Sequence, residues 1–376
     1  MLKMKILLFE LNSFHFEVLP GFAYYLIRLG YEVDCLMQKD DGLGDPFSKC
    51  PLLKKKIRFY YFQKDEKFKA FEELQRQHAY DLLFANSFDY LEKDSWISIF
   101  RKLPSLDKSR LCIVGCLHWP ATFAEDIKNG TIPADRTVVL SKNDDCDNSF
   151  SEVNANYFCD DTLKKPKNQM IRIVSIGRST DRRALWRAAE AARKRIKQPV
   201  YLVCIGKKRS LRSRILFYGL SVIDKLFHVK TYPSVGNILP FFVKHFRKQA
   251  LREVLSPSYQ DMFQEIEAAD FLDGSILLGL KADFSSNRTS GAKQLSLGFL
   301  KPCIIEKCVA DHYGFTDRNA VIYEEGKMDE AVIRAASMTE KEYREMVSEL
   351  EKLRDEIRDR SENNLRHIIS NLESAK

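Results

Sequence analysis

Residue types that bind phosphate stand directly before a predicted helix in the C-terminal half of the chain. Arg288, Thr289, Ser290 and Gly291 precede the helical pattern of residues 292–300. A helix N-terminus has unpaired backbone N–H groups and about half a positive charge, so it attracts a diphosphate. Arginine adds a fork of donors, and glycine lets the backbone approach a ligand closely. The pattern predicts an anion site; alternatively, Thr289 or Ser290 only caps the helix.

A second group of cations follows the predicted strand 170–176. Gly177 and Arg178 come directly after this strand, and Arg182 and Arg183 stand where the next helical pattern opens. Two neighbouring cations can bind an anionic group and stabilise negative charge that develops on it. The alternative for Arg182 and Arg183 is a solvated first helical turn.

Two histidines occupy positions that suit acid–base chemistry. His15 lies in the loop after the first predicted strand, and Glu17 is near enough in sequence to orient its ring or to act as the base itself. An imidazole titrates near neutral pH, which suits it to accept the proton of an attacking hydroxyl. His118 follows another predicted strand, and ligands bind beyond the carboxyl ends of parallel strands. The alternative for His15 is a side chain packed between Phe14 and Phe16.

Two successive patterns of strands and helices must position these residues. A chain of 376 residues is long enough for two hydrophobic cores. Strands alternating with helices predict parallel sheets covered by helices. The predicted strands are 4–11, 31–37, 57–62, 81–85 and 111–117, and, after the polar stretch 160–169, 170–176, 200–205 and 303–305; helices are predicted over 18–29, 183–196, 292–300 and 339–372. We therefore predict an α/β chain with two doubly wound, Rossmann-like domains.

Composition excludes several classes of protein. No uncharged apolar run reaches the roughly 18 residues that a membrane span needs, so we predict neither a signal peptide nor a transmembrane helix. The nine cysteines form no CxxC pair, and an odd count suits reduced thiols in a cytoplasmic protein. We expect no metal site.

Residues 207–253 form a strongly basic segment. They contain 11 Lys or Arg against two acidic residues, a net charge of +9, whereas the whole chain carries +8. Aromatic and aliphatic residues are interleaved with these cations, and basic helices with apolar faces bind anionic membranes. No motif that reads or stacks bases accompanies them, so nucleic acid is not an expected partner. The alternative is a pair of helices packed on the domain with a solvated basic face.

Four stretches together resemble bacterial GT-B glycosyltransferases that build polysaccharides and surface glycans. They are ELNSFHFEVLPGFAYYLIRLGYEV, RIVSIGRSTDRRALWRAAEAARK, YQDMFQEIEAADF and RTSGAKQLSLGFLKP. The resemblance implies two Rossmann-like domains that face each other across a cleft. Residues 1–165 would receive the acceptor, residues 166–350 with the basic insertion 207–253 would bind the nucleotide-sugar, and the helix 351–376 would cross back to the N-terminal domain.

The chain departs from this family at several positions. Gly177 and Arg178 match the Gly-Arg pair of retaining members, but the lysine that follows is missing, so Arg182 or Arg183 would replace it. Of the two glutamates that many retaining members carry, Asp283 stands near the first position and nothing matches the second. The position of His15 is similar to that of the base in inverting members, with the following proline displaced. The stereochemistry therefore stays open.

The resemblance implies a cytoplasmic glycosyltransferase. It would transfer a sugar from a UDP- or GDP-sugar to a lipid-linked surface glycan, at the inner face of the plasma membrane, without a metal or any cofactor besides the donor. Two alternatives remain: a sugar-nucleotide epimerase of the same architecture, and a non-catalytic GT-B-like binding protein.

Overall fold

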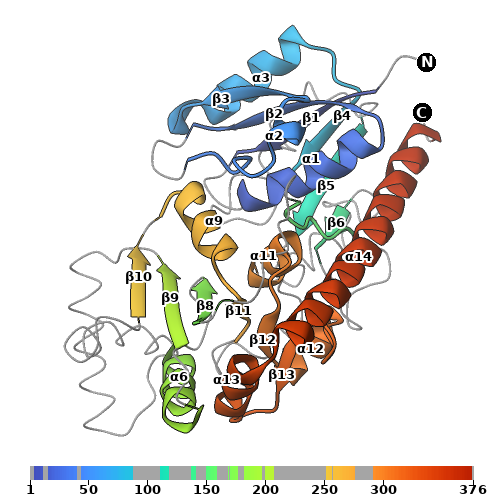
Figure 1. Cartoon of the computed structure of the whole chain (residues 1–376). Coiled ribbons are helices and arrows are strands. Elements are labelled where there is room, and N and C mark those ends of the chain that lie inside the picture. Colours follow the sequence, from blue (N-terminus) through green and yellow to red (C-terminus); the bar gives the residue numbers. More distant parts are fainter. Residues whose placement is uncertain are drawn as a thin grey trace, which may run out of the picture. The chain divides into compact units, whose positions relative to one another are not determined.

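The structure is a computed structural model whose contacts divide the chain into two units (Figure 1). The first unit holds the N-terminal part and the end of the last helix from Arg354, and the second holds most of the intervening part up to Leu353. The structure describes residues 4–11, 16–39, 44–87, 111–117, 137–140, 150–158, 168, 170–176, 182–196, 200–206, 251–255, 257–275 and 291–374.

The first unit is built on a parallel sheet, sheet A. Its seven strands lie in the order β3-β2-β1-β4-β5-β6-β7. The strands are β1 (Lys5–Glu10), β2 (Glu32–Gln38), β3 (Ile57–Phe62), β4 (Leu82–Ala85), β5 (Leu111–Leu117), β6 (Thr137–Val139) and β7 (Ser151–Glu152). Consecutive residues Ile6, Leu7 and Leu8 are all fully buried, so both faces of β1 are covered, as expected for a parallel sheet.

Short helices connect these strands. They are η1 (Phe16–Val18), α1 (Leu19–Arg28), α2 (Pro51–Lys54), η2 (Lys64–Glu66) and α3 (Lys67–Gln77). Gly21 lets α1 pack directly on backbone, because a Cβ there would lie 2.6 Å from the carbonyl carbon of Ala155 and the oxygen of Asn156. Gly30 follows the helix with a φ of 91°, a conformation that other residues rarely adopt.

The second unit is built on another parallel sheet, sheet B. Its six strands lie in the order β10-β9-β8-β11-β12-β13. The strands are β8 (Ile171–Ile176), β9 (Val200–Gly206), β10 (Leu251–Leu255), β11 (Phe271–Asp273), β12 (Cys303–Glu306) and β13 (Val321–Tyr323). The helices are α6 (Arg182–Ile196), α9 (Tyr259–Glu267), α11 (Gly291–Phe299), α12 (Lys307–Tyr313), α13 (Met328–Ser337) and α14 (Glu340–Ser374).

Local sequence signals define the start of α9 and the end of α11. Ser258 and Asp261 form a reciprocal capping box at the start of α9. After α11, Leu300 adopts a φ of 51°, and the Lys301 N–H donates to the Ser296 carbonyl at 2.9 Å. This is the hydrogen bond of a Schellman C-cap, with leucine where glycine is usual.

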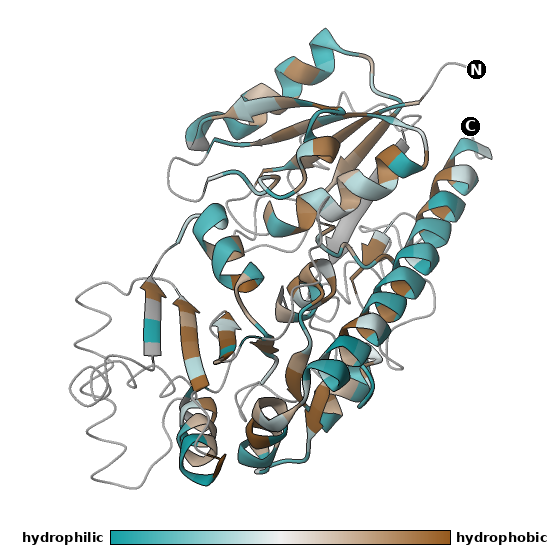
Figure 2. Cartoon of the chain, viewed as in Figure 1, coloured by the Kyte–Doolittle hydropathy of each residue, from teal (hydrophilic) through white to brown (hydrophobic). Residues whose placement is uncertain are grey.

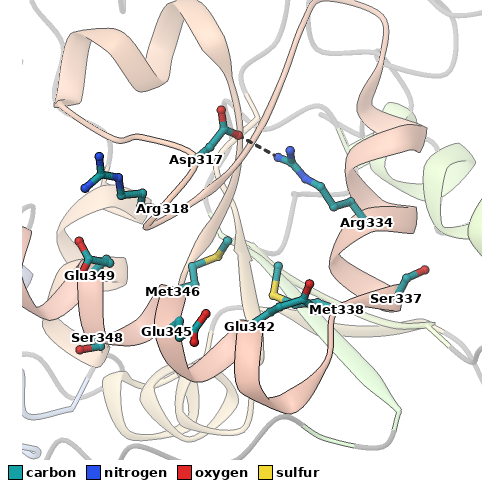
Figure 3. A pocket seen from close by; sticks show the side chains of 10 residues that line it. All are labelled: Asp317, Arg318, Arg334, Ser337, Met338, Glu342, Glu345, Met346, Ser348 and Glu349. Carbon is teal, nitrogen blue, oxygen red and sulfur yellow. Dashed lines mark hydrogen bonds and ion pairs between the residues drawn. The ribbon is translucent and has the colours of Figure 1, made fainter.

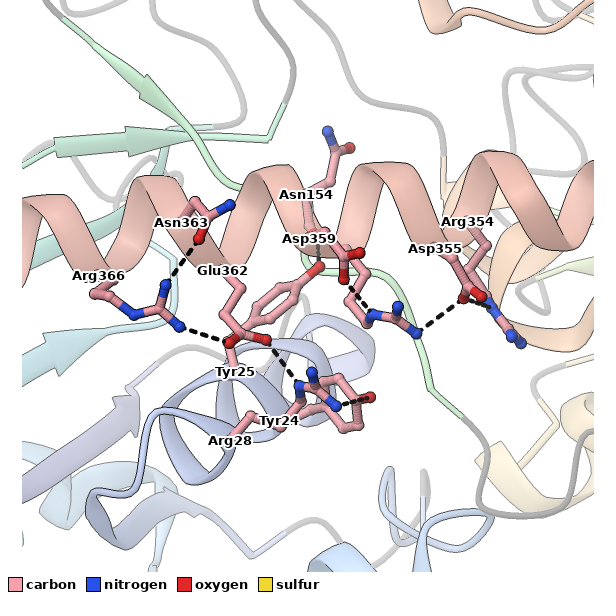
Figure 4. Close-up of polar contacts among 11 residues, drawn as sticks. Tyr24, Tyr25, Arg28, Asn154, Arg354, Asp355, Asp359, Glu362, Asn363 and Arg366 are labelled. Carbon is pink, nitrogen blue, oxygen red and sulfur yellow. Dashed lines mark hydrogen bonds and ion pairs between the residues drawn. The ribbon is translucent and has the colours of Figure 1, made fainter.

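Helix α14 contributes to both units. In the second unit the Tyr343 hydroxyl donates to the Asp270 carbonyl at 3.1 Å. In the first unit Arg28 of α1 donates to Glu362 at 2.8 Å, and Arg366 pairs with the other oxygen of Glu362 at 2.9 Å (Figure 4). These contacts fasten the C-terminal half of α14 to α1.

The prediction of an α/β chain with two doubly wound parallel sheets is confirmed. Strands 57–62 and 111–117 have the predicted bounds, and the other predicted strands agree within one residue at each end. The strands missed are β6, β7, β10, β11 and β13. Most have two or three residues, too few to show a hydrophobic period.

The end of the basic segment 207–253 is corrected. Leu251 to Glu253 belong to β10, which pairs in parallel with β9 and forms an edge of sheet B. Arg252 forms an ion pair with the buried Glu265 at 2.8 Å, and Arg172 contacts the same carboxylate. This part is therefore a strand held by strand pairing and not part of an insertion; residues 207–250 lie outside the described residues.

Hydropathy follows the two sheets. Figure 2 shows the strands mostly brown, whereas teal residues recur along α14. In the part of the chain that the structure describes, no helix combines the length and the apolar composition that crossing a membrane requires.

Candidate functional site

Each sheet reverses its strand order beside its first strand. In sheet A, β1 lies between β2 and β4, and in sheet B, β8 lies between β9 and β11. Ligands of doubly wound proteins bind beyond the carboxyl ends of the strands at such a switch point. The candidate sites are therefore the residues where β1 and β4, and β8 and β11, end.

A buried carboxylate closes the switch point of sheet A. Glu10 ends β1 and is fully buried, as are Asn86 and Ser87 just after β4. The Asn86 side-chain amide donates to Glu10 Oε2 at 2.7 Å, and the Ser87 hydroxyl donates to the same oxygen at 2.5 Å. The Asn86 N–H continues the ladder to the Phe9 carbonyl at 2.8 Å. This network ties the two strands together at the edge where a ligand is expected.

One of the three predicted acid–base residues lies within the described part of the first unit. Glu17 is the central, half-buried residue of η1, which leads from the β1 loop into α1. It follows the carboxyl end of β1 by seven residues, on the connection that leaves the switch point. His15 and His118 lie outside the described residues.

The switch point of sheet B also holds a buried carboxylate. Asp273 ends β11, pairs in register with Ser175 of β8, and is fully buried. Its Oδ1 accepts the Ser275 N–H at 2.9 Å. Burial raises the pKa of the Asp273 carboxyl above its ordinary value, although hydrogen bonds from Ser275 and Ser175 and the charge of Arg182 oppose this. Perturbed groups at such an edge are candidates for function.

Arg182 is the predicted cation that the structure brings to this edge. It is the first residue of α6 and only 8% exposed. Its guanidinium donates to the Ile205 carbonyl near the end of β9, and a Cβ on Gly206 would lie 3.3 Å from its nitrogens. The alternative of a solvated first turn is therefore wrong for Arg182, because its head group lies against β9.

The remaining predicted anion-binding residues are only partly described. Gly291, predicted to precede the helix 292–300, is itself the first residue of α11, and no acidic residue stands in the first turn of that helix. Arg183 is the second residue of α6. Gly177, Arg178, Asp283, Arg288, Thr289 and Ser290 lie outside the described residues, so their roles stay predictions.

A cavity of about 680 Å³ lies elsewhere in the second unit. Its lining includes Asp317 and Arg318, which precede β13, together with residues at the end of α13 and the start of α14 (Figure 3). It therefore lies toward the amino end of β13, away from the edge where ligands bind. Arg334 in its wall is paired with Asp317 at 3.3 Å and is half exposed. We assign the cavity no part in catalysis.

Sequence reasoning missed Glu10, Asn86, Ser87 and Asp273. Each stands at or just after the end of a buried strand, so the available signal was a polar residue that directly follows an apolar run. Among the described residues, no three His, Cys, Asp or Glu side chains converge as a metal site requires.

Comparison with known proteins gives matches in structure alone. No family model and no curated protein matches the sequence. HepE of Anabaena in complex with UDP-glucose is similar with a TM-score of 0.52 and 13% identity, covering 99% of this chain and 100% of that chain. A glycosyltransferase of Rickettsia africae gives a TM-score of 0.54 at 12% identity, with 99% and 98% covered. An alpha-glucosyltransferase in complex with UDP gives 0.52 at 13%, with 96% and 95% covered.

These likenesses span nearly the whole chain. They cover both sheets and confirm the resemblance at the level of the fold: two Rossmann-like domains arranged in sequence as in GT-B glycosyltransferases.

Proposed function

We propose that this chain, which has the GT-B fold, is a glycosyltransferase that moves a sugar from a nucleoside diphosphate sugar to an acceptor hydroxyl. The observation that carries the proposal is the likeness over both units to glycosyltransferases, one of them in complex with UDP-glucose and another with UDP. The polar residues at the switch point of sheet B support it, because Arg182 brings a cation to the edge where the fold binds ligands.

In this proposal the second unit binds the donor. Arg182, with Arg178 and the Arg288 to Gly291 loop before α11, would hold the diphosphate and stabilise its charge as the glycosidic bond breaks. These cations would do the work of a divalent metal, so we propose a metal-independent reaction. Arg183 and Asp283 are the further donor-side candidates.

The first unit would activate the acceptor. His15 is the candidate general base for an inverting transfer, with Glu17 as its orienting partner or as the base itself. His118 would line the same edge. Should transfer retain the anomeric configuration, a general base loses its rationale, and leaving-group stabilisation by the arginines would carry more of the catalysis.

We propose a lipid-linked surface glycan as the acceptor, met at the inner face of the plasma membrane. The basic residues between 207 and 250 support this, because each Lys or Arg near an anionic surface adds roughly 1 kcal/mol of attraction. Changing Lys244, Arg247 and Lys248 together to Glu should release the protein from anionic vesicles and leave nucleotide binding intact. Wild-type protein that ignores such vesicles at low salt would end this part of the proposal.

A screen of nucleotide-sugars tests the function. Calorimetry with UDP- and GDP-sugars measures binding, and release of free nucleotide with and without a lipid extract measures transfer. A product that keeps its nucleotide, formed without acceptor, would identify an epimerase instead. Binding without any turnover would identify a non-catalytic binding protein, and no binding of any nucleoside diphosphate would reject all three functions.

A further inference from the structure

Asp273 has an unused hydrogen-bond acceptor in a fully buried position. Its Oδ1 accepts the Ser275 N–H at 2.9 Å, but its Oδ2 accepts no hydrogen bond within the described structure, although the residue is 0% exposed. Buried polar atoms in native proteins almost always have a partner, and each exception requires an explanation. A buried carboxylate oxygen without a partner has an especially large cost in free energy, because the charged form loses its hydration on burial.

Asp270, at the other end of the same strand, is a buried aspartate with hydrogen bonds to both carboxylate oxygens, and it serves as the structural comparison for Asp273. It lies just before β11 and is 1% exposed. Its Oδ1 accepts the Asn168 N–H at 2.8 Å, and its Oδ2 accepts the Arg172 N–H at 2.8 Å. Both oxygens are therefore satisfied by backbone groups at the amino edge of sheet B.

The two aspartates differ in the edge of the sheet that they occupy. Asp270 is at the amino edge, where doubly wound proteins do not bind ligands, and Asp273 is at the carboxyl edge beside β8, at the switch point. The acceptor without a partner thus lies where the fold receives a ligand. A donor carried by that ligand would complete the hydrogen bonding of Asp273.

Charge narrows the chemistry of that donor. A carboxylate repels a phosphate, and the positive charge of Arg182, which already acts on Asp273, disfavours a second cation. A neutral donor remains, and the hydroxyl groups of ribose and of the transferred sugar are the neutral donors in which a nucleotide-sugar is richest. An O–H donor to a charged acceptor makes a strong, short hydrogen bond.

We infer that Asp273 binds a hydroxyl group of the nucleotide-sugar through Oδ2, an inference that rests on the proposed function. Ribose and the transferred sugar share this chemistry, and the choice of ligands separates them. Asp273 is a binding residue here, so its loss lowers affinity for the ligand that carries the hydroxyl.

The test compares Asp273→Asn with the matched control Asp270→Asn, using calorimetry with UDP, 2′-deoxy-UDP, 3′-deoxy-UDP and UDP-glucose. Asp273→Asn is expected to weaken the binding of the hydroxyl-bearing ligand about 10- to 100-fold, the range for a hydrogen bond to a charged group. Asp270→Asn should bind within about twofold of wild type but melt at a lower temperature, because both oxygens of Asp270 are used. Asp273→Ser, with melting curves, provides a second variant in case the amide disturbs folding.

The ligands distinguish the two sources. If Asp273→Asn loses the same affinity for UDP and UDP-glucose, and loses none for one of the deoxy analogues, Asp273 binds a ribose hydroxyl. If the variant loses affinity for UDP-glucose alone, Asp273 binds a hydroxyl of the transferred sugar. The inference is overturned if Asp273→Asn binds every ligand as wild type does, or loses affinity equally for both deoxy analogues and UDP. If the wild type binds no nucleotide at all, both the proposed function and this inference are rejected.

Discussion

The switch points of the two sheets each hold a buried carboxylate, but the two carboxylates differ in their hydrogen-bond donors. In sheet A, Oε2 of the buried Glu10 accepts hydrogen bonds from Asn86 and Ser87. In sheet B, Oδ2 of the buried Asp273 accepts none within the described structure. The protein itself supplies the donors to the Glu10 oxygen, whereas the Asp273 oxygen receives none at the edge where ligands bind.

This difference predicts that the carboxylate of sheet A contributes to folding stability and that the carboxylate of sheet B contributes to ligand binding. A carboxylate whose donors are supplied by neighbouring strands holds those strands together, and its removal leaves buried donors without an acceptor. A carboxylate oxygen without a donor adds no hydrogen bond to the folded chain, and in our proposal Asp273 Oδ2 gains its partner only when a ligand binds. Substitutions at the edge of sheet A should therefore change stability or the rate of transfer, and those at the edge of sheet B should change donor affinity.

The largest expected effect tests the first unit. If His15 is the general base, His15→Ala should lower the transfer rate by about 10²- to 10⁴-fold with little change in donor affinity. The wild-type rate should also fall at acidic pH as the imidazole is protonated. Steady-state kinetics and calorimetry measure the two quantities. Glu17→Gln should be milder if Glu17 only orients the ring, and an unchanged rate in His15→Ala would remove the histidine from the mechanism.

Glu10→Ala should be the most destabilising change at the edge of sheet A. It leaves the buried donors of Asn86 and Ser87 without their acceptor, which is expected to cost about 2 to 5 kcal/mol in the free energy of unfolding. Urea unfolding measures the loss. Glu10→Gln keeps an acceptor oxygen and should lose less than half as much. Equal stability of Glu10→Ala and wild type would show that the hydrogen bonds to Glu10 do not stabilise the fold.

The arginines predicted to bind the diphosphate should affect binding and not stability. Arg178→Ala and Arg288→Ala should each weaken nucleoside diphosphate affinity by about 1.5 to 3 kcal/mol, as expected for losing a charge-assisted hydrogen bond. Calorimetry measures affinity, and melting temperatures provide the control. Unchanged dissociation constants in both variants would show that the diphosphate binds elsewhere.

The smallest expected effect is the pH dependence of stability at Asp273. Because burial raises the pKa of this carboxyl in the folded state, the folded chain holds the proton more tightly than the unfolded chain. The wild type therefore loses stability as pH rises from the unfolded pKa through the raised folded pKa. Asp273→Asn does not titrate, so its unfolding free energy relative to wild type should increase between acidic and neutral pH. A difference that shrinks with rising pH would contradict the burial of an ionised carboxylate.

The local pattern of the sequence determined the fold class and the long elements. Apolar runs such as 57–62 and 111–117 predict strands with the observed bounds, because a buried parallel strand is apolar along its whole length. The strand 271–273 is too short to show a pattern, and β10 was hidden within a basic segment. Both become strands because neighbouring strands pair with them, and pairing between distant segments leaves no local signal.

At the candidate sites, too, the sequence determined some features and the tertiary structure decided the others. Residue type and position near a helix start predict Arg182 and Gly291 as anion-binding candidates, and each is the first residue of its helix. That Glu10 has its donors, and that Asp273 lacks one, depends on which strands lie side by side and on what surrounds each carboxylate. Only the tertiary structure decides this, because burial and hydrogen-bond partners are contributed by residues far away in the sequence.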